Sequence, residues 1–337
     1  MKFIVYFLIA AIPFFITACD RSDEVGTLTL NVGGDGLSGD SPVDKKIQEM
    51  FEKYEVLFKY KYDEAEYCYN WTEFIDINIL PYSPAKEEYV ERVINYFEDE
   101  IFSIFPEGFI KKHLQPTILL ADSLKMEWEY IDNVAGNRYA DYHNLWGNVT
   151  RNYIVIGHVS ADFDFTSRDM KEVLISLFVE RMMINNKSWP KPQAFLDVSG
   201  ESYGSFGGNY WNGEFNDLAY WTSSYPPGGA TEYFDWWRLG MLRHGRLIHH
   251  GYEHTVLWGM DFSLWAMAKL TTGQDFGDYV AFIISRTAAE KETFFADVAS
   301  RPTSYGGAAA VAKMRTKMQL VKDYFQTNFG ITLTEPN

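Results

Sequence analysis

Residues 169–185 read DMKEVLISLFVERMMIN, and this stretch predicts the helix around which the rest of the fold is arranged. Ser167 precedes it and is a residue type that caps helix N-termini. Asn185-Asn186, shortly before Trp189-Pro190, marks its end. Apolar residues recur at helical spacing along one side, which predicts an amphipathic helix: Val173, Leu174, Leu177, Phe178 and Met182.

Short apolar runs on the N-terminal side of this helix predict strands. Residues 56–62 alternate in the manner of a strand, and 116–121 and 153–156 have the composition of buried strands. The stretch between the last two is rich in Gly and Asn and predicts loops. Further helices are expected at 45–54, 86–102, 232–242, 259–270 and 308–329, with 276–285 either helix or strand. The sequence therefore predicts an α+β fold with a small mixed sheet and a helical C-terminal half.

The first 19 residues have the pattern of a bacterial lipoprotein signal. Lys2 precedes an apolar run from Phe3 to Phe15, and Cys19 follows directly after Ile16-Thr17-Ala18, where its thiol can be acylated. A membrane-spanning helix is the alternative, but Pro13 interrupts the run, which is shorter than the ~20 residues that a bilayer span needs. We therefore predict a signal peptide over 1–18, an acidic, Gly-rich tether over 19–45, and a single domain over 46–335.

Charge and cysteine content exclude several classes of protein. The chain has 46 acidic and 30 basic residues, and no stretch is basic enough to bind a polyanion, so we expect no nucleic-acid partner. Cys68 is the only cysteine besides Cys19. With Cys19 acylated, the chain can form neither an internal disulfide nor a thiolate metal cluster.

Motifs for two kinds of hydrolase are incomplete. His250 and His254 have the four-residue spacing of zinc-binding histidines, but Gly251 stands where a general-base glutamate is expected, so a surface histidine patch is the favoured interpretation. Ser202 lies in a formal Gly-x-Ser-x-Gly sequence, but it is followed by glycines rather than by a helix. Candidate carboxylate pairs are too numerous in this acidic chain to indicate a glycosidase.

Aromatic residues make up 17% of the chain, and several alternate with glycine in one loop-like stretch. Such residues can cover a large core or form a recognition surface. The candidate ligand-binding residues are Tyr203, Phe206, Tyr210, Trp211, Trp221, Trp236 and Trp237.

The order of these features resembles a family of Bacteroidota lipoproteins, the substrate import-associated zinc metallohydrolases. The resemblance rests on the acylation motif, the early strand with Lys59-Tyr60-Lys61-Tyr62 and the strand over 116–121. It extends through the helix from Asp169 and the segment Met260-Asp261-Phe262, and it implies a zincin-like domain.

The family's zinc motif is degenerate in this chain. The positions that correspond to His-Glu-x-x-His are Ser176, Leu177 and Glu180, and those of a later acidic motif include Met260 and Asp261. Catalytic zinc needs about three protein ligands, so we expect no catalytic residues and no cofactor. Zinc at His250 and His254 is the alternative.

The resemblance also implies a place and a role. Family members resemble accessory lipoproteins that work beside TonB-dependent transporters and the substrate-binding lipoproteins of those transporters. We therefore expect a lipid-anchored outer-membrane protein that binds a nutrient or a partner. The expected binding place is a retained cleft between the Asp169 helix and the sheet. Asp20 after the acylated cysteine favours inner-membrane retention in many bacteria. In the group that the family resembles, Asp20, Asp23 and Glu24 look like a surface-export signal, which we favour. An active hydrolase and a purely structural subunit are the other hypotheses.

Overall fold

The computed structural model describes most of the chain between residues 39 and 336. The described residues are 39–68, 78–80, 83–114, 117–131, 138–144, 146–149, 153–185, 189–199, 217–218, 240–242, 270–301 and 307–336. Cys19 and the predicted signal peptide lie outside them. None of the described helices has the length and apolar character needed to cross a bilayer.

A four-stranded mixed sheet lies at the centre of the N-terminal part. Its order is β1-β3-β7-β6, in which β1 (Leu57–Lys59), β3 (Thr117–Leu120) and β7 (Tyr153–Ile156) are parallel and β6 (Gly147–Val149) is antiparallel. All four residues of β7 are buried, as expected for a parallel strand covered on both faces. The predicted mixed sheet is confirmed, although β1 is shorter than the predicted 56–62 strand.

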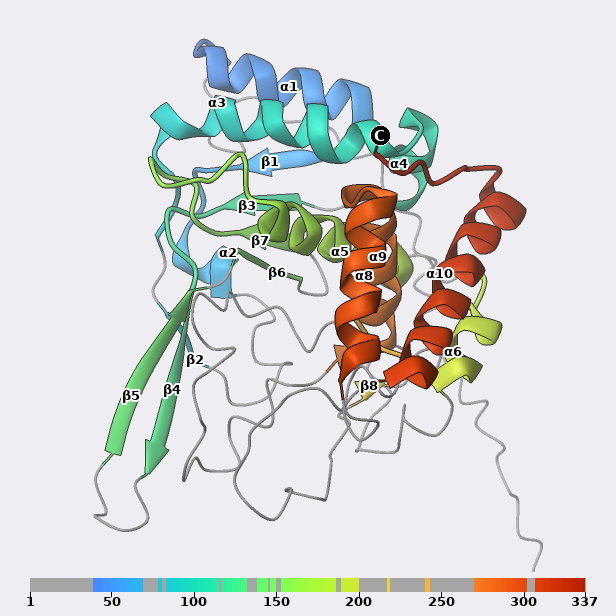
Figure 1. Ribbon diagram of the computed structural model, residues 1–337. Coiled ribbons are helices and arrows are strands. Elements are labelled where there is room, and N and C mark those ends of the chain that lie inside the picture. Colours follow the sequence, from blue (N-terminus) through green and yellow to red (C-terminus); the bar gives the residue numbers. More distant parts are fainter. Residues whose placement is uncertain are drawn as a thin grey trace, which may run out of the picture.

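The stretch between β3 and β7 is not the loop that its glycine and asparagine content predicts. It contains β4 (Lys125–Ile131) and β5 (Arg138–Asn144), which pair with the short β2 (Asn78–Leu80) in a second, antiparallel sheet. Figure 1 shows β4 and β5 extending away from the four-stranded sheet. Cross-strand pairing, which a local composition does not reveal, decided this region.

Two helices lie beside β1. Helix α1 (Pro42–Tyr54) begins after Ser41, whose Oγ accepts from the Asp44 backbone N–H, so the helix includes four residues that the sequence assigned to the tether. Helix α3 (Glu87–Tyr96) runs beside α1 (Figure 1) and continues as a π-helical turn over 97–101 and a 3-10 turn over 102–104. The single α-helix predicted over 86–102 is thus divided into three parts.

Aromatic rings connect this region to the central helix. Phe97 contacts Phe58 of β1 at 5.8 Å between ring centroids and Phe178 of α5 (Arg168–Asn185) at 5.5 Å. Phe102 contacts the same two rings and Tyr54 of α1. The ring cluster joins α1, β1 and α5 in one apolar core.

Helix α5 forms where the sequence predicts it, but its environment differs from the prediction. Ser167 caps it, because its Oγ accepts from the Met170 backbone N–H at 3.1 Å. Residues 172–183 are buried on every side, so the helix is not amphipathic in the folded protein. The face without the apolar stripe is covered by another helix, α8 (Thr272–Ser285), rather than by solvent.

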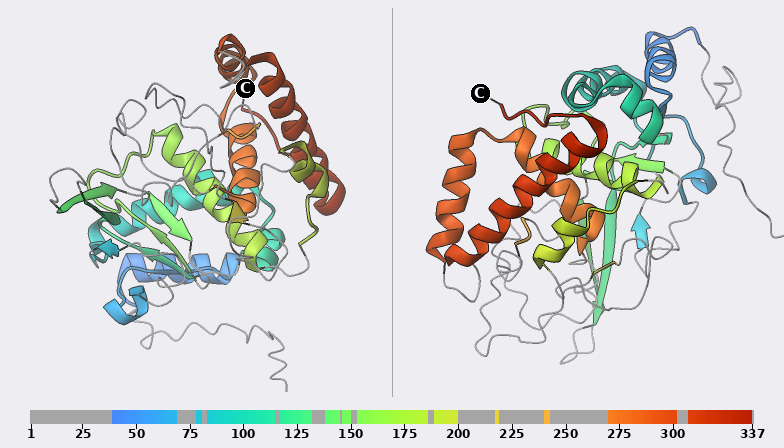
Figure 2. Two further views of the ribbon diagram at one scale, coloured as in Figure 1. Left: turned by 90° about the horizontal axis from the view of Figure 1, so that it is seen from below. Right: turned by 90° about the vertical axis from the view of Figure 1, so that its right-hand side faces the viewer.

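The predicted helices at 232–242 and 259–270 lie mostly outside the described residues, and their described ends, 240–242 and Leu270, are not helical. Where the structure describes it, the C-terminal half is mainly helical, as predicted. Besides α8 it contains α9 (Ala288–Ser300) and α10 (Gly307–Phe329), which Figures 1 and 2 show gathered on one side of the molecule, away from α1. The remaining described elements are α2 (Glu64–Cys68), α4 (Glu107–His113), α6 (Gln193–Ser199), β8 (Asp217–Leu218) and β9 (Leu270–Thr271). No helix is among those expected from the sequence at α6, and the sequence leaves helix or strand open for 276–285; both segments are helical.

Candidate functional site

Three of the residues predicted to stand in for a zinc motif lie in the buried middle of α5. Ser176 and Glu180 are four residues apart and therefore share a face of the helix. Leu177 points toward β6, since a Cβ built on Gly147 would lie 2.7 Å from Leu177 Cδ1. Where the structure describes it, α5 is thus in direct contact with the edge of the sheet at Leu177. Exposed fractions are 1% for Ser176, 0% for Leu177 and 3% for Glu180.

Helix α8 covers the face of α5 that carries Ser176. The Ser176 Oγ donates to the Gln274 carbonyl oxygen at 3.3 Å. Gly277 is in backbone contact with the same residue, because a Cβ at this position would lie 2.7 Å from the Ser176 carbonyl oxygen and 3.1 Å from its Cα. Glycine at 277 is what allows the two helices to approach so closely.

A second contact fixes the direction of the two helices. Ser176 contacts Gln274 near the start of α8, whereas Glu172, one turn earlier in α5, pairs with Arg286 just after the end of α8. An earlier residue of α5 thus contacts a later residue at α8, so the two helices are roughly antiparallel. Glu180, one turn beyond Ser176, therefore lies toward the beginning of α8, where β9 pairs with β8.

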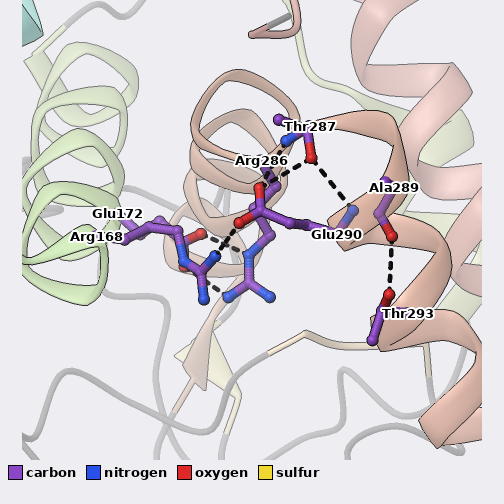
Figure 3. A network of polar contacts seen from close by, with 7 residues as sticks. All are labelled: Arg168, Glu172, Arg286, Thr287, Ala289, Glu290 and Thr293. Atoms are coloured by element: carbon purple, nitrogen blue, oxygen red, sulfur yellow. Dashed lines mark hydrogen bonds and ion pairs between the residues drawn. The ribbon is translucent and has the colours of Figure 1, made fainter.

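The Glu172–Arg286 contact belongs to a polar network that joins α5, α8 and α9 (Figure 3). Arg286 donates from Nε to Glu172 Oε1 at 2.6 Å and from Nη2 to Oε2 at 3.1 Å. Its guanidinium also lies over the rings of Phe282 and Phe294, at 4.9 and 5.7 Å from their centroids. Burial lowers the pKa of Arg286 from its ordinary value. A two-bond pair between aromatic rings fixes side-chain orientation as well as distance.

The outer part of this network lies nearer the surface. Arg168 donates to Glu290 at 2.7 Å, and Glu290 also forms a capping box with Thr287 at the start of α9. Hydrogen bonds from Thr287 lower the pKa of Glu290. The four charged side chains Arg168, Glu172, Arg286 and Glu290 join α5 to the consecutive helices α8 and α9, which lie far from it in the sequence.

A buried ion pair connects α8 with α10. Lys317 Nζ lies 2.7 Å from Asp275 Oδ2, and both side chains are fully buried. The ammonium group also faces the rings of Phe195 and Tyr279, 4.5 and 5.6 Å from their centroids. Burial lowers the pKa of Lys317, while Asp275 opposes that shift. The sequence reasoning missed this cluster because an Asp and a Lys in amphipathic helices ordinarily indicate a solvated face.

The segment between α6 and α8 is attached at two places, at α8 itself and at the strand directly before it. The Tyr279 hydroxyl donates to the Gly240 carbonyl oxygen at 2.5 Å, and Met241 beside it is fully buried. Strand β9, directly before α8, pairs with β8. The predicted aromatic residues Tyr203, Phe206, Tyr210, Trp211, Trp221, Trp236 and Trp237, together with His250, His254, Met260 and Asp261, lie outside the described residues.

The residues at the described α5 positions do not fit a zinc ion. The Ser176 hydroxyl is engaged by a carbonyl oxygen, Leu177 has no donor atom, and Glu180 supplies one carboxylate. Over the part of the chain that the structure describes, no three His, Cys, Asp or Glu side chains approach one another closely enough to hold a metal.

Comparison with known proteins gives one similar solved structure. No protein-family model matches the chain, and no curated protein matches it. A crystal structure from Bacteroides caccae, described as a "putative zinc-binding metallo-peptidase", is similar to it with a TM-score of 0.47 and 12% sequence identity, over 90% of this chain and 89% of that chain.

Proposed function

We propose that the protein is a lipid-anchored outer-membrane protein with a zincin-like domain, acting as a non-catalytic binding or accessory component of TonB-dependent nutrient uptake. The anchor is Cys19, and Asp20, Asp23 and Glu24 direct the protein to the cell surface. The partners are a TonB-dependent transporter and its substrate-binding lipoprotein. The sequence resemblance to substrate import-associated zinc metallohydrolases supports this role.

One observation carries the non-catalytic part of the proposal. The position that corresponds to the first zinc-binding histidine is Ser176, and its surroundings are filled by Gln274 and Gly277 of α8. An imidazole is much larger than a hydroxymethyl group, and the Gly277 backbone leaves no room for growth on this face. Leu177, in the position of the general base, cannot take a proton from a metal-bound water.

The binding surface is formed by the aromatic residues between α6 and α8. Tyr203, Phe206, Tyr210, Trp211, Trp221, Trp236 and Trp237 are the proposed contacts. Aromatic side chains can stack on sugars or hold an extended peptide at a low entropic cost. Two contacts support this assignment: Tyr279 of α8 donates to Gly240, and β8 pairs with β9 directly before α8. Both keep parts of the segment between α6 and α8 next to α8.

An active metallohydrolase is the second candidate, favoured by the four-residue spacing of His250 and His254. A structural subunit of the uptake complex is a third. Co-purification with membrane partners in the absence of any affinity for a small ligand would favour the third.

Metal content separates the first two candidates. We expect the purified mature chain, dialysed against trace zinc, to contain no stoichiometric zinc by mass spectrometry. Glu180→Ala should behave identically. Stoichiometric zinc that is lost in the His250→Ala/His254→Ala variant, together with peptidase activity, would overturn the proposal in favour of the hydrolase.

Localisation is tested independently of metal content. We expect radiolabelled palmitate to be incorporated into the protein and to be lost in Cys19→Ala, which should also leave the membrane fraction. Extracellular protease should degrade the wild-type protein on intact cells. Protection of the protein in intact cells but not in lysed cells would contradict surface exposure.

A further inference from the structure

The segment that follows α10 is attached to three helices of the C-terminal half. Residues 330–336, which we call the strap, form neither helix nor strand. Glu335 accepts a hydrogen bond from Lys322 of α10, and its other oxygen lies 3.1 Å from Lys291 Nζ of α9. Lys291 also donates to the carbonyl oxygen of Ile283, near the end of α8, at 2.7 Å. One carboxylate thus ties the strap to α10 and α9 and, through Lys291, to α8.

Two apolar side chains of the strap are buried. Ile331 and Leu333 are 7% and 6% exposed and belong to the hydrophobic core, whereas Thr332 and Thr334 are exposed. Burial therefore alternates along the strap, as it does where successive side chains of a chain point to opposite sides. The strap is recognised by apolar side chains at 331 and 333 and by a carboxylate at 335. We call the parts of α8, α9 and α10 that it contacts the strap-binding surface.

A single glycine joins the strap to α10. The helix ends at Phe329 and Ile331 is already buried, so Gly330 alone forms the hinge. Its φ is +67°, a left-handed conformation that disfavours any residue with a Cβ. No described atom lies within 4 Å of the place where its Cβ would be. Glycine is therefore required here for the backbone conformation of the closed strap and not for space.

We infer that the strap is exchangeable, and that the strap-binding surface takes the strap of a second copy of this chain. In the exchanged pair each strap lies on the helices of the other copy, so every contact of the closed form is made again and no new complementary surface is needed. The two forms differ only in the conformation of Gly330 and in the cost of bringing two chains together. A hinge of one residue favours exchange, because it closes the strap in a single backbone conformation.

The position of the strap allows a second copy to reach it. In the right-hand view of Figure 2 the strap runs from the end of α10 to the edge of the molecule, on the side of α9. Gln326, Thr327 and Asn328 in the last turn of α10 are exposed. The side chains of Lys322 and Glu335 are 28% and 30% exposed, so this ion pair can open and form again at the surface.

The concentration of the chain decides which form is populated. A strap that is linked to its own helices competes at an effective concentration of about 1 mM. We therefore expect closed monomers at about 1 μM and substantial exchange near about 1 mM. Gly330→Ala strains the closed hinge in each copy, whereas residue 330 can take another conformation in the exchanged pair. This change should lower the concentration needed for exchange at least about tenfold.

Isotope-coded cross-linking of the unacylated mature chain, in reducing buffer, tests the exchange. Chains of natural isotope content and chains labelled with heavy nitrogen are mixed in equal amounts, and a carbodiimide then joins Lys291 to Glu335 without a spacer. At about 1 μM each link should join groups of one isotope only. At about 1 mM about a quarter of the links should join a light chain to a heavy one, because about half of the chains are exchanged. A light–heavy fraction that does not rise with concentration would overturn the proposal.

Gly108→Ala is the matched control for Gly330→Ala. No described atom lies within 4 Å of either Cβ position, and of the two glycines only Gly330 has a positive φ. At about 0.1 mM Gly330→Ala should show about tenfold more light–heavy links than the wild type, and Gly108→Ala should match the wild type. An equal increase in both variants would show that the hinge conformation does not control association.

Loss of an apolar anchor shows whether association uses the strap. Leu333→Asp places a charge at a buried position, so it should prevent docking on either copy and leave a monomer at about 1 mM in sedimentation equilibrium. A dimer that persists in Leu333→Asp would place the interface elsewhere and overturn the proposal. The comparison of Leu333→Asp with the wild type at this concentration keeps the test decisive if Gly330→Ala does not fold.

Discussion

The sheet half of the domain and its helical half bury different kinds of side chain. The sheet half, α1, α3 and the β1-β3-β7 strands, is filled by aliphatic and aromatic residues such as Ile47, Val93 and Ile118, each fully buried. In the helical half, α5, α6 and α8 to α10, ten of the twelve buried polar or charged residues of the described chain are found. They are Glu172, Ser176, Glu180, Arg181, Ser199, Gln274, Asp275, Asp278, Lys291 and Lys317.

This difference shows what each half requires of its sequence. Apolar packing tolerates exchange among residues of similar volume, so periodicity suffices to place the sheet half. Buried ion pairs tolerate only their own partners, because a charge without its partner is costly in a low-dielectric interior. The contacts Glu172–Arg286 and Asp275–Lys317 thus set how α5, α8 and α10 lie against one another.

The largest effect is expected for Lys317→Met in the helical half. This change leaves the fully buried Asp275 carboxylate without its lysine partner and should lower the free energy of unfolding by about 3–5 kcal/mol. Urea unfolding at pH 7 measures it. Lys317→Met/Asp275→Leu should cost less than the single change, and Lys313→Met, one turn earlier, should be nearly neutral. A double variant as unstable as the single one would show that the pair is not the cause.

The apolar side of α5 should give the next largest effect. Leu177→Ala removes a fully buried side chain that contacts the sheet at Gly147, and it should cost about 3 kcal/mol because a cavity is left. Leu320→Ala on α10 removes the same atoms from a partly exposed position and should cost less than half as much. Chemical denaturation of both variants gives the comparison. If Leu177→Ala and Leu320→Ala lowered the free energy of unfolding equally, the residues between α5 and the sheet would have collapsed into the cavity at position 177.

A smaller effect is expected where α5 and α8 meet. In Gly277→Ala the new Cβ would meet backbone atoms of Ser176 rather than the end of a flexible side chain, so the helices must separate, at a cost of about 2 kcal/mol. Gly108→Ala in α4 is the matched control, since nothing lies within 4 Å of its Cβ position. The control should stabilise the protein by up to about 1 kcal/mol. If Gly277→Ala left the free energy of unfolding unchanged, the closest contact between α5 and α8 would have to lie at another residue.

Hydrophobic periodicity predicted elements in both halves wherever the pattern is local. It identified β3 and β7 of the sheet half and α5 of the helical half, and Ser167 marked the start of α5 correctly. It missed β4 and β5, whose pairing is long-range and whose flanks are rich in glycine and asparagine.

The candidate site was predicted only in position. Ser176 and Glu180 share a face of α5, as four-residue spacing requires, but the pattern within α5 does not reveal that α8 covers this face. Gly277 in the middle of an apolar helix was the available clue, since a glycine there is unfavourable unless another backbone approaches closely. Arg286 and Lys317 were missed because their partners are distant in sequence.

The smallest effect is expected at the rim of the sheet half, where polar contacts are partly solvated. Glu98 accepts from Lys46 and from Lys53, each at 2.6 Å, and these hydrogen bonds, the one from Lys46 first, lower the pKa of Glu98. Glu98→Gln should cost less than about 1 kcal/mol at pH 7, and less still in 1 M salt.

The pH dependence of this small difference identifies its origin. A carboxyl group whose pKa is lowered in the folded state stabilises the protein above its ordinary value of 4.5, and this stabilisation is lost as the pH falls through the folded value. The stability difference between wild type and Glu98→Gln should therefore be constant from pH 7 to pH 5 and vanish in more acidic solution. A difference that persists at pH 3 would show that packing of the Glu98 side chain, rather than its charge, joins α1 to the π-helical turn.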